Sequence, residues 1–94
     1  MNASARVERR IKVINKLGLH ARAAAKLAKL AAGFGCRVEL RRAEQVADAK
    51  SIMGVMTLAA TQGSEITLVA HGADAERAAA AVCALFADCF GEGE

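Results

Sequence analysis

The sequence predicts a two-layer α+β domain in which three amphipathic helices cover one face of a four-stranded sheet. Segments in which apolar and polar residues alternate, as in half-buried strands, are separated by segments with an apolar stripe at helical spacing. Their order is strand, helix, strand, strand, helix, strand, helix (βαββαβα), and helices with one apolar face must bury it against a sheet. The 94 residues suffice for a single domain, 1–94, whose ordered core we expect over about 6–90.

The composition excludes several classes of protein. The chain is 54% hydrophobic and 24% charged, which favours a folded soluble domain over a disordered one. Its apolar runs are too short to cross a membrane and no signal segment opens it, so we expect a cytoplasmic protein. The three cysteines include no CxxC pair and lie far from both histidines, so we expect reduced thiols, no metal and no cofactor.

The first strand and helix are predicted from a change of period. Residues 7–13 alternate as a strand, although Arg9 falls on the apolar phase and indicates an exposed or frayed start. Residues 15–19 contain a glycine and read as a loop. From His20 the apolar positions recur at helical spacing, and Gly33 is expected to end the helix in a left-handed cap or a turn.

The middle of the chain is predicted to form a hairpin. Residues 36–41 alternate as a second half-buried strand, and residues 45–49 as a short third one. The turn at Ala43 and Glu44 lacks the glycine that favours tight hairpins.

The first strand, the first helix and the second strand form a strand–helix–strand unit. This unit should cross over right-handed, with another strand lying between its two strands.

Two helices and one strand complete the order. Ser51 is a good N-cap for a short helix to about Leu58, and residues 66–70 alternate as the fourth strand. Asp74 can cap the last helix, whose apolar stripe should pack on the sheet and which Gly91 should end. Cys83 and Cys89 lie in the alanine-rich pattern of this helix, where small buried apolar residues are expected.

His20 is the residue that could carry chemistry. A group at the start of a helix faces unpaired N–H donors and the positive end of the helix dipole, which together favour an anion such as phosphate. Arg22 can reach the same anion with its planar fork of donors. A neutral imidazole nitrogen can attack phosphorus. His71 has no such setting, and we expect it to be a turn residue without a chemical role.

Three segments resemble one known family. Residues 15–25 (NKLGLHARAAA) resemble the active-site segment of HPr, the histidine-containing phosphocarrier of the bacterial sugar phosphotransferase system, and of its nitrogen-related paralogue. Residues 50–58 (KSIMGVMTL) resemble that family's regulatory serine and following helix, and residues 62–74 its fourth strand and last helix start. The resemblance covers about residues 6–90 and implies an open-faced sandwich with a four-stranded antiparallel sheet and three helices on one face.

The resemblance also implies roles for residues. His20 would be phosphorylated on the ring nitrogen nearer the backbone, and Arg22 would steady the phosphoryl group. The chain would be a stoichiometric carrier and a monomer rather than an enzyme, and it would exchange phosphate with enzyme I and enzyme IIA-type domains. Ser51 would be a target of an HPr kinase/phosphorylase. The partner surface, with Ile52 and Met53 exposed and Met56 turned partly inward, would comprise Ala21, Lys26, Lys29, Ile52, Met53 and Met56.

One position departs from the family pattern. The family typically has proline after the His-x-Arg triplet, where this chain has Ala23 and contains no proline at all. Alanine preserves the helix, loosens the unfolded chain at a cost of about 0.4–1 kcal/mol, and adds one N–H donor near the anion site. We therefore expect the fold to be kept and the transfer rate to be affected.

Two other functions compete with sugar transport. A regulatory paralogue of the nitrogen-related branch would signal through its phosphorylation state, and the segment NKLGLHAR fits that branch equally well. A small nucleic-acid-binding module is allowed by the net charge of +3. Bases stack on aromatic side chains of strands, whereas this chain has no Tyr or Trp and its phenylalanines lie outside the predicted strands. We therefore expect no nucleic-acid partner.

Overall fold

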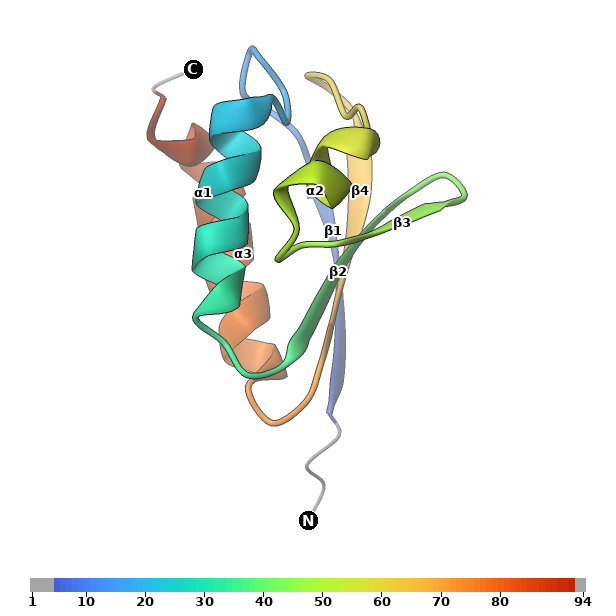
Figure 1. The fold of residues 1–94 in the computed structure, drawn as a ribbon, viewed down its shortest axis with the longest axis vertical. Helices are drawn as coiled ribbons and strands as arrows, with labels where there is room; N and C mark the ends of the chain where they lie inside the picture. The colour runs from blue at the N-terminus through green and yellow to red at the C-terminus, as the bar shows by residue number, and fades with distance from the viewer. Residues whose placement is uncertain (1–4, 93–94) are drawn as a thin grey trace.

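A computed structural model describes residues 5–92 of the chain. Within them, four strands and three α-helices follow the predicted order, and a final 3-10 turn is added (Figure 1). The elements are β1 (Arg6–Lys12), α1 (Ala21–Ala32), β2 (Arg37–Arg42), β3 (Gln45–Asp48), α2 (Ile52–Thr57), β4 (Glu65–His71), α3 (Ala75–Ala87) and the 3-10 turn η1 (Cys89–Gly91).

The strands form one antiparallel sheet in the order β1-β4-β2-β3. Val7 lies opposite Ala70 and Ile11 opposite Ile66 in the β1–β4 ladder, while Leu40 of β2 lies opposite Leu68 of β4. The strand between β1 and β2 that the crossover rule requires is therefore β4. The fold predicted from the sequence is confirmed, including its antiparallel sheet.

All three helices lie on one side of the sheet (Figure 1). The side chains they bury meet the inward-facing strand residues in one continuous apolar core, and its large members include Leu27, Leu40, Leu68, Val82 and Phe86. The alternation that predicted the strands arises because every second residue enters this core. Such burial contributes about 25 cal/mol for each Å² of apolar surface removed from water.

Gly33 ends α1 in a turn, the second of the two predicted alternatives, with φ −75° in the right-handed region. The ends of α3 differ from those predicted. Asp74 occupies the N-cap position of α3 but its side chain caps nothing. Its Oδ2 instead accepts a hydrogen bond of 3.4 Å from the Gly35 N–H. The last helix ends at Ala87 rather than at Gly91, because the backbone turns left-handed at Cys89.

Two further predictions need correction. His71 is the last residue of β4, paired with Arg6 and Arg37, and not a turn residue. Cys83 and Cys89 are only partly buried. The start of the first strand is exposed at Arg6 and Arg9, as one of the two predicted alternatives has it, and Arg6 is already paired.

The predicted hairpin of β2 and β3 is present, with Arg42 opposite Gln45. Ala43 supplies the turn by adopting a left-handed φ of 55°, which explains why no glycine was needed to close it. Among residues 5–92 no helix is long and apolar enough to cross a membrane.

Candidate functional site

The loop before α1 is held rigidly against the rest of the molecule. Asn15 is fully buried and its Nδ2 donates a 2.7 Å hydrogen bond to the carbonyl of Gly18. The Leu19 N–H donates to the Ala60 carbonyl at 2.9 Å, which ties the loop to the segment between α2 and β4. Gly18 has φ +64°, a left-handed conformation that favours glycine. The residue that follows this loop, His20, therefore has a fixed position.

His20 is the N-cap residue of α1. Its backbone is extended, with φ −77° and ψ 179°, and its Nδ1 accepts a 3.3 Å hydrogen bond from the Ala23 N–H. The side chain thereby satisfies one of the unpaired donors of the first helical turn. The first turn contains no acidic residue, so the positive end of the helix dipole is not neutralised there. The imidazole is 25% exposed and can be reached from solvent.

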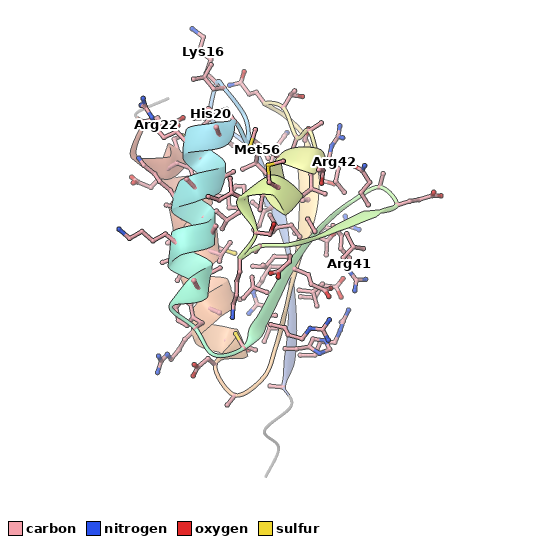
Figure 2. The ribbon with its side chains drawn as sticks, viewed as in Figure 1. Lys16, His20, Arg22, Arg41, Arg42 and Met56 are labelled. Atoms are coloured by element: carbon pink, nitrogen blue, oxygen red, sulfur yellow. The ribbon has the colours of Figure 1, made fainter. Side chains whose placement is uncertain are left out.

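A hollow of about 690 Å³ lies in front of this imidazole. Its lining includes three cationic side chains, those of Lys16, Arg22 and Lys26. Figure 2 shows Lys16 and Arg22 at the same end of the molecule as His20. Arg22 is exposed and has no hydrogen bond or ion pair with the described residues. The hollow is lined by Lys16, Leu17, His20, Ala21, Arg22, Lys26, Gly91 and Glu92.

Not every cation of the hollow is equally available. Lys26 donates from Nζ to the carbonyl of Phe90 at 2.6 Å, so it fastens the C-terminal turn as well as lining the site. Lys29 lies outside the hollow, in a separate groove beside Leu30 and Phe34. Lys26 lines this groove as well as the hollow, so the basic side chains of α1 extend from one to the other.

The C-terminal turn contributes a carboxylate that the sequence did not predict. Glu92 Oε2 lies 2.7 Å from Nε2 of His20. Glu92 Oε1 accepts a 3.3 Å hydrogen bond from Nδ2 of Asn15. Residue 92 lies beyond the ordered core expected over about 6–90, because nothing local in the sequence indicates that it folds back onto residue 20.

Ser51 and the short helix α2 form a neighbouring surface. Ser51 is the N-cap, and its Oγ accepts a 3.0 Å hydrogen bond from the Gly54 N–H. Ile52, Met53 and Met56 are 44%, 73% and 40% exposed. Met56 is the least exposed of the three (Figure 2), in line with the expected partly inward position, and Val55 fills the buried position of this short helix.

The structure brings four of the predicted site residues into one place and adds others. His20, Arg22, Ala21 and Lys26 line the hollow, whereas Ser51 and its apolar neighbours lie on α2, which packs beside α1. Lys16, Leu17 and Glu92 were missed. Leu17 is 68% exposed, and a large apolar residue in the loop before His20 was the one available signal. No three metal-ligating side chains cluster within residues 5–92.

Comparison with known proteins places these features in one family. The family model described as the PTS HPr component phosphorylation site matches residues 7–88. The chain is 53% identical to phosphocarrier protein HPr of Cupriavidus necator over 94% of its own length and 99% of that protein. It is 45% identical to phosphocarrier protein NPr of Shewanella violacea, covering 85% of the chain and 88% of that protein.

A solved structure shows the same fold. The crystal structure of HPr-C-His from Thermoanaerobacter tengcongensis superimposes with a TM-score of 0.88 at 40% identity, covering 92% of this chain and 97% of that one.

Proposed function

The chain belongs to the HPr family of phosphotransferase-system phosphocarriers, and from that premise we propose that it carries a phosphoryl group on Nδ1 of His20. The donor would be phosphorylated enzyme I and the acceptors enzyme IIA-type domains. The observation that carries the proposal is the position of His20, which caps α1 at the edge of a hollow lined by Lys16, Arg22 and Lys26.

The chemistry follows from that position. The lone pair of Nδ1 attacks the phosphorus of the donor's phosphoryl group, the N–P bond forms, and the donor keeps the electron pair of the bond that breaks. The attack requires Nδ1 to leave the Ala23 N–H, and at 3.3 Å that hydrogen bond is long. The freed N–H and the positive end of α1 then face the phosphoryl oxygens.

Arg22 has the second role in the transfer. Its exposed guanidinium can pair with two phosphoryl oxygens as charge moves onto them, and it makes no hydrogen bond or ion pair with residues 5–92 that would have to break first. Because the same hydrogen-bond donors contact the phosphoryl group when it arrives and when it leaves, they hold it without preventing its transfer onward. The protein then acts stoichiometrically, passing on what it accepts.

The docking surface would combine the rim of the hollow with α2. The exposed apolar side chains of Leu17, Ile52, Met53 and Met56 offer adaptable contact area to more than one partner. Ala21, Lys26 and Lys29 lie on α1, whose basic side chains would meet an acidic partner surface. Brief, modest interfaces of this kind suit a relay.

Ser51 would be the regulatory position. It stands at the N-terminus of α2, directly before the exposed Ile52 and Met53, and within residues 5–92 its Oγ is bound only as an acceptor. An HPr kinase would add about −1.5 to −2 charges there, which would disfavour docking to an acidic partner. Incubation with a cognate kinase that leaves Ser51 unmodified would exclude this role.

The experiment that tests the carrier function is intact-mass measurement after incubation with phosphoenolpyruvate and an active enzyme I. We expect wild type and His71→Ala to gain one acid-labile phosphate, and His20→Ala to gain none. His71 is the matched control because it is exposed on β4, far from the hollow in the sheet register. If wild type gains no phosphate, the fold is retained without the chemistry, and Ala23 becomes the first residue to examine.

A regulatory role in the nitrogen-related branch is the second candidate. The similarity to an NPr protein as well as to an HPr protein supports this second role. Pull-down of the phosphorylated chain with sugar-type and nitrogen-type enzyme IIA proteins would separate the two, because each branch predicts retention of only its own acceptor.

A further inference from the structure

Both nitrogens of the His20 ring are engaged by the protein. Nδ1 accepts from the Ala23 N–H at 3.3 Å, and Nε2 lies 2.7 Å from Oε2 of Glu92. Nε2 and Oε2 are both enclosed, and neither makes a hydrogen bond within residues 5–92. Their contact at 2.7 Å is therefore an electrostatic one.

The two contacts require the same proton arrangement. A neutral imidazole has one donor and one acceptor nitrogen, and the partner of each nitrogen decides which is which. Because Nδ1 accepts, the ring hydrogen belongs on Nε2, and the negative charge of the Glu92 carboxylate 2.7 Å away favours it there. The lone pair is thereby kept on the nitrogen at the helix N-terminus.

Contacts with the core and with α1 hold the C-terminal turn that carries Glu92 in place. Phe90 is 1% exposed and packs edge-on against Phe86 with ring centroids 4.8 Å apart. Lys26 fixes the carbonyl of Phe90, and Asn15 fixes the second carboxylate oxygen of Glu92. Cys89 and Phe90 both adopt positive φ, of 52° and 55°, which reverses the chain towards His20.

The chain reversal at Cys89 and Phe90 is strained. Two successive left-handed residues other than glycine each cost about 1–2 kcal/mol, and they persist only where the surrounding contacts determine them. The result is a carboxylate that is only 14% exposed and is aimed at the rear of the imidazole, on the side opposite Nδ1.

We propose that Glu92 is a positioning residue for phosphoryl transfer: its carboxylate holds His20 as the Nε2–H tautomer and balances the positive charge that the ring gains when Nδ1 bonds to phosphorus. In that step Nδ1 gains the N–P bond, the donor keeps the electrons of the broken bond, and Nε2 keeps its hydrogen beside Oε2. The inference deepens the proposed function and rests on His20 as the acceptor.

The test combines a tautomer measurement with a transfer rate. Nitrogen NMR of the neutral ring should find the hydrogen on Nε2 in wild type, and a mixture of tautomers in Glu92→Ala. The transfer rate from phosphorylated enzyme I should fall roughly tenfold or more in Glu92→Ala, because the positive charge that develops on the ring then has no carboxylate beside it. Glu92→Gln keeps an acceptor oxygen without charge, so it should retain the tautomer and still transfer slowly.

Two further variants sharpen the result. Glu44→Gln, at the exposed hairpin turn, removes a carboxylate far from the site and should match wild type in both measurements. Ala23→Pro removes the N–H that meets Nδ1 while proline remains acceptable in a first helical turn. We expect it to keep the Nε2–H tautomer, because Glu92 is still present.

Unchanged tautomer and rate in Glu92→Ala would overturn the inference. A tautomer that changes in Ala23→Pro but not in Glu92→Ala would overturn it as well, by assigning control to the backbone. The tautomer measurement needs no phosphoryl donor. If wild type accepts no phosphate, the proposed function fails, whereas the NMR comparison still decides whether Glu92 positions the ring.

Discussion

Replacing Gly18 by alanine should destabilise the protein and disturb His20 together. A Cβ added to Gly18 would lie 2.5 Å from the Ala60 carbonyl oxygen and 2.9 Å from the Cα of Thr61. Both are backbone atoms, so no side-chain rotation can relieve the contact. Because the Leu19 N–H donates to the same Ala60 carbonyl, any relief must move the loop that carries His20.

The size of the effect can be separated into two parts. A left-handed φ costs an alanine about 1–2 kcal/mol relative to glycine. Forcing extra volume into a packed site adds about 1–3 kcal/mol. The free energy of unfolding of Gly18→Ala should therefore fall by about 2–5 kcal/mol, a large share of the ~5–15 kcal/mol typical of a small domain.

Gly63 provides the matched control. It also has a positive φ, of +92°, but a Cβ there meets nothing within 4 Å. Gly63→Ala should lose only the conformational part of the stability. The φ of Gly63 lies further than that of Gly18 from the favoured left-handed value near +57°, so this part should be at least as large at Gly63 as at Gly18. Urea unfolding of both variants, with equal slopes, measures the difference. Equal losses of stability in the two variants would refute the clash as the cause.

Three other changes test separate parts of the structure. Ser51→Ala should lower the free energy of unfolding by about 1 kcal/mol through loss of the N-cap bond, whereas Ser51→Gly should cost a few tenths; urea titration distinguishes them, and equal effects would argue against capping. Phe90→Ala should cost about 3–5 kcal/mol because the ring is buried, and a loss below 1 kcal/mol would show that the C-terminal turn is not part of the core. Burial raises the pKa of the Cys83 thiol, and nearby Arg9 partly opposes this. Cys83 should therefore alkylate more slowly at pH 8 than a free thiol, speed up as the pH rises, and react more slowly still in Arg9→Gln; mass spectrometry follows the reaction, and a rate equal to that of free cysteine would contradict it.

Most of the fold could be predicted because its signals are local. The alternation around Val7 and Val38 and the helical spacing around Leu27 each report which side of an element is buried. Ser51 caps α2 as its residue type suggests. Asp74 shows the limit of such rules, since the same residue type accepts a bond from the distant Gly35 rather than from its own helix. At Asp74 a tertiary contact therefore replaces the local cap.

The site could be predicted only in part for the same reason. His20 and Arg22 are neighbours in sequence, so their meeting at the helix start follows from helix geometry. Glu92 reaches His20 only through the left-handed reversal at Cys89 and the burial of Phe90. Neither residue type favours that conformation, so no local pattern indicates it. The carboxylate beside the imidazole is a product of the packed fold.

The sheet order has a consequence for how the chain folds. The two middle strands are β4 and β2, and β1 reaches the sheet only by pairing with β4, from Lys12 opposite Glu65 to Arg6 opposite His71. The hairpin of β2 and β3 closes a far shorter loop, and each doubling of loop length adds about 0.6 kcal/mol to the entropy cost of closure. We therefore expect the hairpin to form early and β1 to dock late.

Until β1 docks, one side of β4 presents unpaired N–H and C=O groups in an otherwise assembled sheet. The strand that fills this gap can come from the same molecule or from a second copy, with the same hydrogen bonds and the same buried side chains. At low concentration the chain's own strand wins because it is tethered. Crowded refolding would instead favour exchange of β1 between two molecules, an intertwined dimer with an unaltered sheet in each half.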